Sequence, residues 1–113
     1  MKIIKEISIS EIKEMAPKIF GNMVKAVVDI EKKEIALDAE LHADLEQILL
    51  ENGSKQKDLW GINFYPDFFG DEDFLEFDSM INIRPSQNNN SRGVEDEKTQ
   101  QAIISIIKQA IKS

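Results

Sequence analysis

Hydrophobic positions near the N-terminus recur with helical spacing behind a capping signal. Ser8 and Glu11 stand three residues apart, as in a capping box, and the apolar positions that follow share one helical face. The pattern predicts a helix from about residue 9 towards Phe20. Pro17 has no amide hydrogen to donate within a helix, so we expect a kink or a break at that residue.

The next part of the chain changes from a strand-like to a helical period. Apolar and polar residues alternate over 24–30, a charged stretch interrupts at 31–34, and Ile35 and Leu37 resume the pattern. This predicts two antiparallel strands joined by a charged turn. Apolar residues at positions 41, 45, 48 and 49 then form a helical stripe, and Asp38 is the expected N-cap of that helix.

Two further strands and a helix are predicted in the second half. Residues 59–65 and 74–84 both alternate, with a loop between them. In the longer run, alternation places Ile81 and Ile83 in the core and Asn82 and Arg84 on the opposite face.

The chain then enters a polar loop and a last helix. The loop extends from Pro85 to Gly93, and Asp96 or a neighbour caps a helix that reaches about Lys112. The order of elements is helix, hairpin, helix, hairpin, helix. It predicts one α+β domain over residues 1–113: a two-layer sandwich in which a four-stranded antiparallel sheet, built from two hairpins, packs against about three helices.

Composition narrows the function classes. The 113 residues carry a net charge of −7, which disfavours long-range attraction to nucleic acid or to anionic membranes. The chain has no cysteine, so disulfides, thiol nucleophiles and thiolate zinc sites are excluded. Apolar runs are too short to span a bilayer, and charge at the N-terminus gives no signal peptide. We therefore expect a cytoplasmic protein with no membrane partner.

Several segments occur in an order that is specific to one protein family. They cover most of the chain from Phe20 onward: FG (20–21), MVKAVVD (23–29), ELHAD (40–44), GSKQ (53–56), LWGIN (59–63), FDSMINIRP (77–85) and SRGVED (91–96). In these segments the chain resembles a family of short bacterial proteins, the domain of unknown function 5674. The resemblance implies no assigned activity. The family often has two glycines where this chain has Asp38 and Ala39.

His42 is the only histidine of the chain, and acidic residues lie four positions away on both sides. One interpretation is a general acid–base near neutral pH; the other is a partly buried histidine on a helix surface. An acidic stretch at 67–78 is either a site for a hard cation or a set of solvated carboxylates. Its spacing does not match a calcium-binding loop, and we predict no metal and no cofactor.

The stretch from Arg84 to Arg92 is the strongest candidate for a ligand site. Both arginines of the chain lie in it, among amide and hydroxyl side chains, and a helix N-terminus follows. Arginine forks and a helix N-terminus both favour an anion. The alternative is an ordinary polar loop whose arginines pair with nearby acids.

The sequence leaves the function unknown and favours a non-catalytic binding or interaction module with an anion-accepting loop at residues 84–93. The alternative is a small hydrolase or ribonuclease-like enzyme that uses His42 with Arg84 and Arg92. An enzyme requires His42 to converge on the arginine loop in one cleft. Expected partners are an unknown protein, including a second copy of this chain, or a small anionic ligand, whereas nucleic acid is disfavoured. The candidate ligand-binding residues are Arg84, Arg92, Ser91, Asn82, Asn63 and His42.

Overall fold

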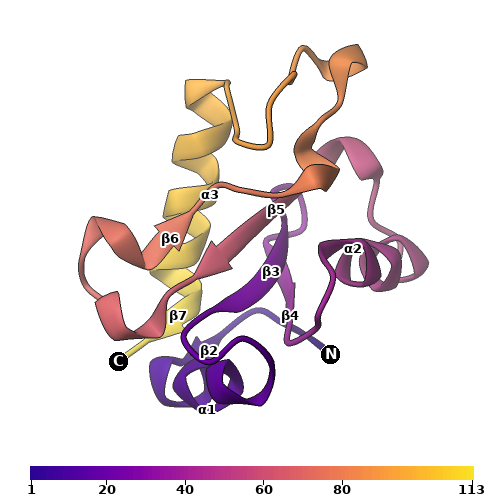
Figure 1. Cartoon of the computed structure of the whole chain (residues 1–113). Coiled ribbons are helices and arrows are strands. Elements are labelled where there is room, and N and C mark those ends of the chain that lie inside the picture. The colour runs from indigo at the N-terminus through magenta and orange to yellow at the C-terminus, as the bar shows by residue number, and fades with distance from the viewer.

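The computed structural model describes residues 1–113 as one antiparallel sheet with helices against it (Figure 1). The sheet has five strands in the order β1-β4-β3-β5-β6. A short parallel pair, β2 with β7, joins segments near the two ends of the chain. The elements are β1 (Lys2–Ile4), β2 (Ile7–Ser8), α1 (Ile9–Ile19), β3 (Val24–Asp29), β4 (Glu34–Leu37), α2 (His42–Glu51), β5 (Leu59–Phe64), β6 (Leu75–Glu76), α3 (Glu97–Ala110) and β7 (Ile111–Lys112).

The N-terminal helix confirms the capping prediction. The Ser8 hydroxyl accepts a hydrogen bond from the Glu11 amide at 3.2 Å, and α1 begins at the next residue. The helix continues through Pro17 to Ile19, so a break at Pro17 is wrong. Pro17 lies in the last turn of α1, where it costs the helix one backbone hydrogen bond. The buried face of the helix stabilises it despite this loss.

The predicted hairpin at 24–37 is confirmed as the antiparallel pair β3 and β4. The helix after it begins at His42 and not at Asp38. Asp38 has a φ of +74°, which is a left-handed conformation and not that of a helix N-cap. Glycine adopts this conformation readily, in agreement with the glycine that often stands here in the family that the chain resembles. Residues 38–40 therefore form a bend between β4 and α2.

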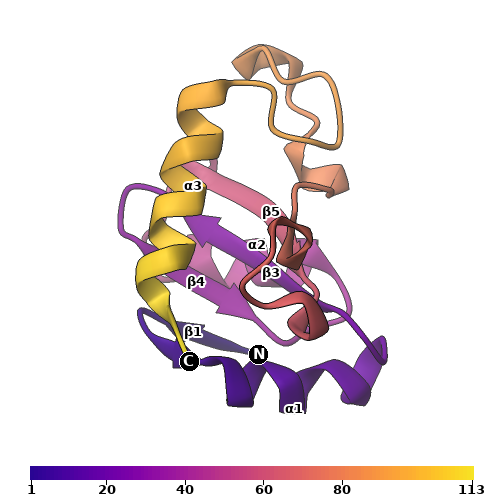
Figure 2. The same ribbon diagram turned by 90° about the vertical axis from the view of Figure 1, so that its left-hand side faces the viewer.

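Helices cover both faces of the sheet, so the structure has three layers where the sequence predicted two (Figure 2). The even-numbered residues of β3 and β5 pack with α1 and α3 in the larger core. Val27 of β3 and Leu59 of β5 pack with Leu45 and Leu49 of α2 on the other face. Because α2 has only 10 residues, we infer that it covers only part of its face. No helix is long and apolar enough to cross a membrane.

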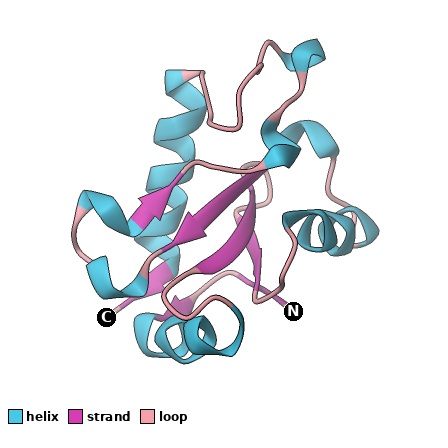
Figure 3. Cartoon of the chain, viewed as in Figure 1, coloured by secondary structure: helices cyan, strands magenta, loops and turns pink.

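The expected long strand at 74–84 is wrong. Only Leu75 and Glu76 pair with β5, and Figure 3 shows loop and short helical turns beyond them. The predicted count of four strands is also wrong, for a separate reason: β1 adds a fifth strand beside β4. Asn82 is completely buried, whereas Ile83 is 39% exposed and Ile81 is half-buried, which reverses the predicted faces.

Side chains replace the missing strand pairing along the edge of β5. The Asn82 amide accepts from the Gly61 amide at 2.8 Å and donates to the Gly61 carbonyl at 2.9 Å. Arg84 donates to the carbonyls of Leu59 and Gln56. Buried backbone groups need partners, and these two side chains supply them without a strand. Asn82 and Arg84 are consequently part of the fold.

Candidate functional site

A cleft of about 430 Å³ opens on the sheet face that carries α2. Its walls come from β3, β5, β6, the first residues of α2 and the segments around residues 78–81 and 92. We call it the His42 cleft. Its polar and charged lining residues are Lys25, His42, Asn63, Tyr65, Glu76, Asp78, Ser79 and Arg92, and its apolar lining residues are Phe20, Met23, Leu41, Ala43, Met80 and Ile81.

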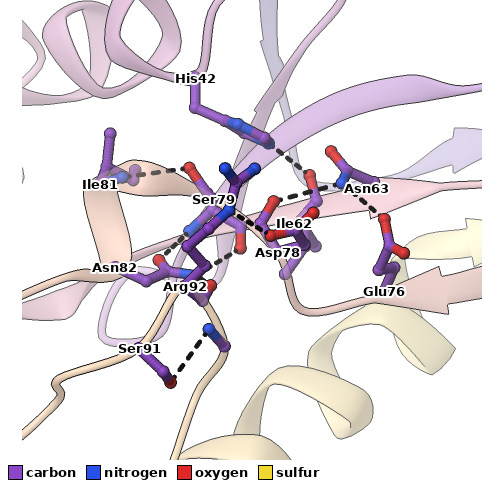
Figure 4. A network of polar contacts seen from close by, with 12 residues as sticks. His42, Ile62, Asn63, Glu76, Asp78, Ser79, Ile81, Asn82, Ser91 and Arg92 are labelled. Atoms are coloured by element: carbon purple, nitrogen blue, oxygen red, sulfur yellow. Dashed lines mark hydrogen bonds and ion pairs between the residues drawn. The ribbon is translucent and has the colours of Figure 1, made fainter.

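Asn63 and its neighbours form a hydrogen-bonded network in the cleft (Figure 4). The Asn63 amide nitrogen donates to Glu76 Oε1 at 2.9 Å and to the Asp78 carbonyl at 3.2 Å. Tyr65 donates its hydroxyl to the same Glu76 oxygen at 2.9 Å. Burial, and then the Glu76 carboxylate, raises the pKa of Tyr65, which keeps the phenol protonated. Because its nitrogen has two acceptors, the Asn63 amide has one orientation.

In that orientation the Asn63 oxygen has no partner at normal hydrogen-bond distance and acts only on the nearby His42 ring, whose pKa it raises. The side chain is only 4% exposed, and Oδ1 lies on the side of His42, away from the partners of the nitrogen (Figure 4). Buried acceptors without a partner are uncommon in folded proteins. This oxygen is the feature of the cleft that the fold alone does not satisfy.

His42 is the first residue of α2, and its ring lies over β5. Nε2 is 2.9 Å from the Ile62 carbonyl, an acceptor, so Nε2 carries the proton and Nδ1 is left as an acceptor in the neutral ring. Burial lowers the pKa of His42, and the Lys25 charge acts in the same direction, while the Ile62 carbonyl and the Asn63 side chain oppose them. The imidazole is therefore neutral at physiological pH.

Arg92 points two unpaired nitrogens into the cleft. Its Nε donates to Asp78 Oδ1 at 2.6 Å, and its terminal nitrogens lie on the side of His42 (Figure 4). Lys25 supplies a second positive charge to the cleft, with Nζ 5.0 Å from the centre of the Phe20 ring and no acidic partner within salt-bridge distance. Two cations with free donors are available to one ligand.

The N-terminus of α2 also faces the cleft. Leu41, the N-cap, provides no side-chain hydrogen bond, and Leu41, His42 and Ala43 line the cleft. The first turn of a helix presents free amide hydrogens and a partial positive charge. By contrast, the Asp96 carboxylate accepts from the Thr99 amide at the start of α3, so that helix already has an anion.

The structure brings together three of the six candidate ligand-binding residues. His42, Asn63 and Arg92 line the His42 cleft, and Asn82, Arg84 and Ser91 do not. The Arg84 guanidinium lies 4.2 Å from the centre of the Trp60 ring and is 8% exposed. The hydroxyl of Ser91, whose residue is exposed, accepts from the Gly93 amide at 3.2 Å. The convergence of His42 with the arginine loop therefore occurs through Arg92 alone.

Some lining residues were not among the sequence candidates. Strand alternation places Lys25, Tyr65 and Glu76 on one face with Asn63, so the pattern could have identified them. The apolar lining had no such signal, because Phe20, Met23, Leu41 and Met80 come from separate turns and loops that meet only in the fold. No group of three or more metal-ligating side chains exists, and the acids at 67–78 do not form one.

Comparison with known proteins identifies one family. No curated protein and no solved structure matches the chain. The model of a family described as "Protein of unknown function (DUF5674)" matches residues 1–110, which confirms the resemblance in the sequence. The chain belongs to the DUF5674 family.

Proposed function

We propose that this protein is a non-catalytic binding module and that its ligand binds in the His42 cleft through an anionic group. The observation that carries the proposal is the arrangement of Arg92. Asp78 holds this side chain through Nε, which leaves both terminal nitrogens free beside His42. An arginine oriented by this ion pair can donate two charge-assisted hydrogen bonds to a carboxylate or phosphate.

Two neighbouring features support an anion at this place. Lys25 adds a positive charge without an acidic partner, and the uncapped N-terminus of α2 adds backbone donors. The proposal moves the anion site expected at residues 84–93 to the Arg92 end of that loop. The Arg84 end is occupied by backbone carbonyls of Gln56 and Leu59.

A hydrolase or ribonuclease-like enzyme is the second candidate, and one observation favours it: His42 and Arg92 share a cleft. Two features favour the binding module instead. Ser79 is 1% exposed and its hydroxyl accepts from the Ile81 amide, so it is poorly placed as a nucleophile. Arg84, the third group of the enzyme hypothesis, contacts Trp60 and backbone carbonyls.

Binding of a carboxylate, benzoate, and of its neutral analogue benzamide tests the proposal. Benzoate is expected to shift the NMR signals of Lys25, His42 and Arg92, and benzamide to bind about tenfold more weakly, because it lacks the charge that strengthens the hydrogen bonds. Arg92→Gln should greatly reduce the difference between the two compounds, and what is left comes from Lys25 and the N-terminus of α2. Lys13→Gln, which removes an exposed charge on α1, is the matched control and should preserve the full difference.

Equal binding of benzoate and benzamide, or shifts centred on another surface, would contradict the proposal.

The other expectations from the sequence belong to the same proposal: a protein partner, including a second copy of the chain, no role in binding nucleic acid, a cytoplasmic location and a bacterial source. Fractionation of the native cells tests the location.

A further inference from the structure

We propose that the ligand of the His42 cleft is a zwitterion with an apolar side group, of the class of the apolar α-amino acids. This inference rests on the proposed function, since it takes the anion at Arg92 as one of three points of attachment. The other two are an acceptor-rich part of the cleft, which suits an ammonium group, and an exposed apolar rim.

The charges of the cleft are balanced. Lys25 and Arg92 are the two cations that line it, and Glu76 and Asp78 are the two carboxylates. A ligand that is only an anion would meet two negative charges together with the two positive ones. A zwitterion presents both signs within a few ångströms, which matches both pairs.

The candidate acceptors for an ammonium group are Asn63 Oδ1, on the His42 side of that amide, and the second oxygen of Glu76, on the side of the amide nitrogen. Asn63 Oδ1 is buried and has no partner, and only one Glu76 oxygen is hydrogen-bonded, by Tyr65 and Asn63. An ammonium group has three donors and no acceptor, so it satisfies such a place better than a hydroxyl does. Leaving a buried acceptor unsatisfied is costly, and a ligand donor would remove that cost.

The apolar rim accounts for the side group. Three large side chains at the cleft are unusually exposed for their type: Phe20 at 37%, Leu41 at 55% and Met80 at 65%. They come from three separate segments, after α1, before α2 and after β6. An aliphatic or thioether side chain placed among them would remove apolar surface of both molecules from water. Methionine adapts to varied shapes, which suits a rim for such a group.

Calorimetric titration of the full chain with L-leucine and three analogues tests this inference. N-acetyl-L-leucine lacks the ammonium, L-leucinamide lacks the carboxylate, and glycine lacks the side group. Leucine should bind most tightly, and each analogue at least about tenfold more weakly, since each lacks one attachment. Glu76→Gln keeps an oxygen for Tyr65 and Asn63 but removes the charge, so it should weaken the binding of leucine and leave that of N-acetyl-leucine equal or stronger.

The outcomes separate the inference from the proposed function. If benzoate and N-acetyl-leucine bind at least as well as leucine, the ligand is a simple carboxylate, and the zwitterion is overturned while the anion site stands. If leucinamide equals leucine, or if neither benzoate nor leucine binds, the anion site fails as well. A tenfold loss in Arg92→Gln for both leucine and N-acetyl-leucine, with the Glu76→Gln loss confined to leucine, would support both.

Discussion

Replacement of Asn82 by alanine tests whether one side chain completes the sheet. The side chain has no exposed surface and makes three hydrogen bonds: from the Gly61 amide at 2.8 Å, to the Gly61 carbonyl at 2.9 Å and to the Arg92 carbonyl at 2.9 Å. Alanine cannot make any of them. Both backbone groups of Gly61, on a fully buried strand, then lose their partners.

The magnitude follows from the number of groups left unpaired. A buried group without a partner costs about 1–3 kcal/mol, so two groups of Gly61 and the weakened contact to Arg92 give a loss of about 3–5 kcal/mol. A domain of this size has a free energy of unfolding of about 5–15 kcal/mol, so the variant should remain folded but become fragile. In urea, with a slope of about 2 kcal/mol/M, the unfolding midpoint should fall by about 2 M.

Two comparison variants make this measurement specific. Asn90→Ala removes an exposed asparagine of the same loop whose side chain makes no hydrogen bond, and it should shift the midpoint little. Asn82→Asp keeps an acceptor for the Gly61 amide but turns a carboxylate towards two carbonyls. It should be at least as unstable as alanine at pH 7 and recover in acid, where the protonated group donates. A loss below about 1 kcal/mol in Asn82→Ala would refute the reasoning, since water would then replace the amide.

Three further predictions concern neighbouring residues. Arg84→Lys should lower the free energy of unfolding by about 2–3 kcal/mol in urea, because one ammonium cannot replace a fork between two carbonyls, whereas exposed Arg92→Lys should cost under about 1 kcal/mol. Gly61→Ala should be strongly destabilising because its Cβ would lie 2.4 Å from Ser79 Cβ, and Ser79→Gly should partly restore the melting temperature. Burial in the folded protein lowers the pKa of His42 below 6.5, so the contribution of His42 to the free energy of unfolding should be fully present above that pH and decrease as the pH falls. His42→Gln should flatten this part of the curve of stability against pH. An unchanged slope in that variant would assign the pH dependence to other groups.

Local signals were sufficient for the elements that have them. Ser8 and Asp96 cap α1 and α3 where the sequence predicted caps, because the cap hydrogen bond joins residues three apart. Alternation identified β3, β4 and β5 for the same reason, since neighbouring side chains of a strand take opposite faces. Which segments pair at the two edges of the sheet, by contrast, depends on residues far apart in the chain.

The segment from Phe77 to Gly93 shows what local patterns omit. Its alternation is compatible with a strand, but Asn82 and Asn89 make buried hydrogen bonds to carbonyls and amides that a strand would have used. Asn89 alone donates to the carbonyls of Asn82, Ser91 and Gly93. Side-chain amides compete with backbone pairing, and only the folded chain decides which partner is within reach. Asn82, which was expected at a ligand site, is therefore structural, and so is its neighbour in the loop, Asn89.

A side-chain hydrogen bond from Asn82 also helps to position Arg92, so the stability of the fold is linked to the binding of an anion in the His42 cleft. The Arg92 carbonyl accepts from the Ser79 amide and from Asn82 Nδ2, both at 2.9 Å, so the backbone of residue 92 is held beside the cleft by two donors. Asn82→Ala removes one of them, and the Arg92 side chain is then positioned chiefly by Asp78. At low temperature, where the variant is fully folded, benzoate should therefore bind several-fold more weakly than to the unchanged chain, while Asn90→Ala should bind it equally. Unchanged affinity in folded Asn82→Ala would show that the ion pair with Asp78 alone positions the guanidinium, and would separate the anion site from the edge of β5.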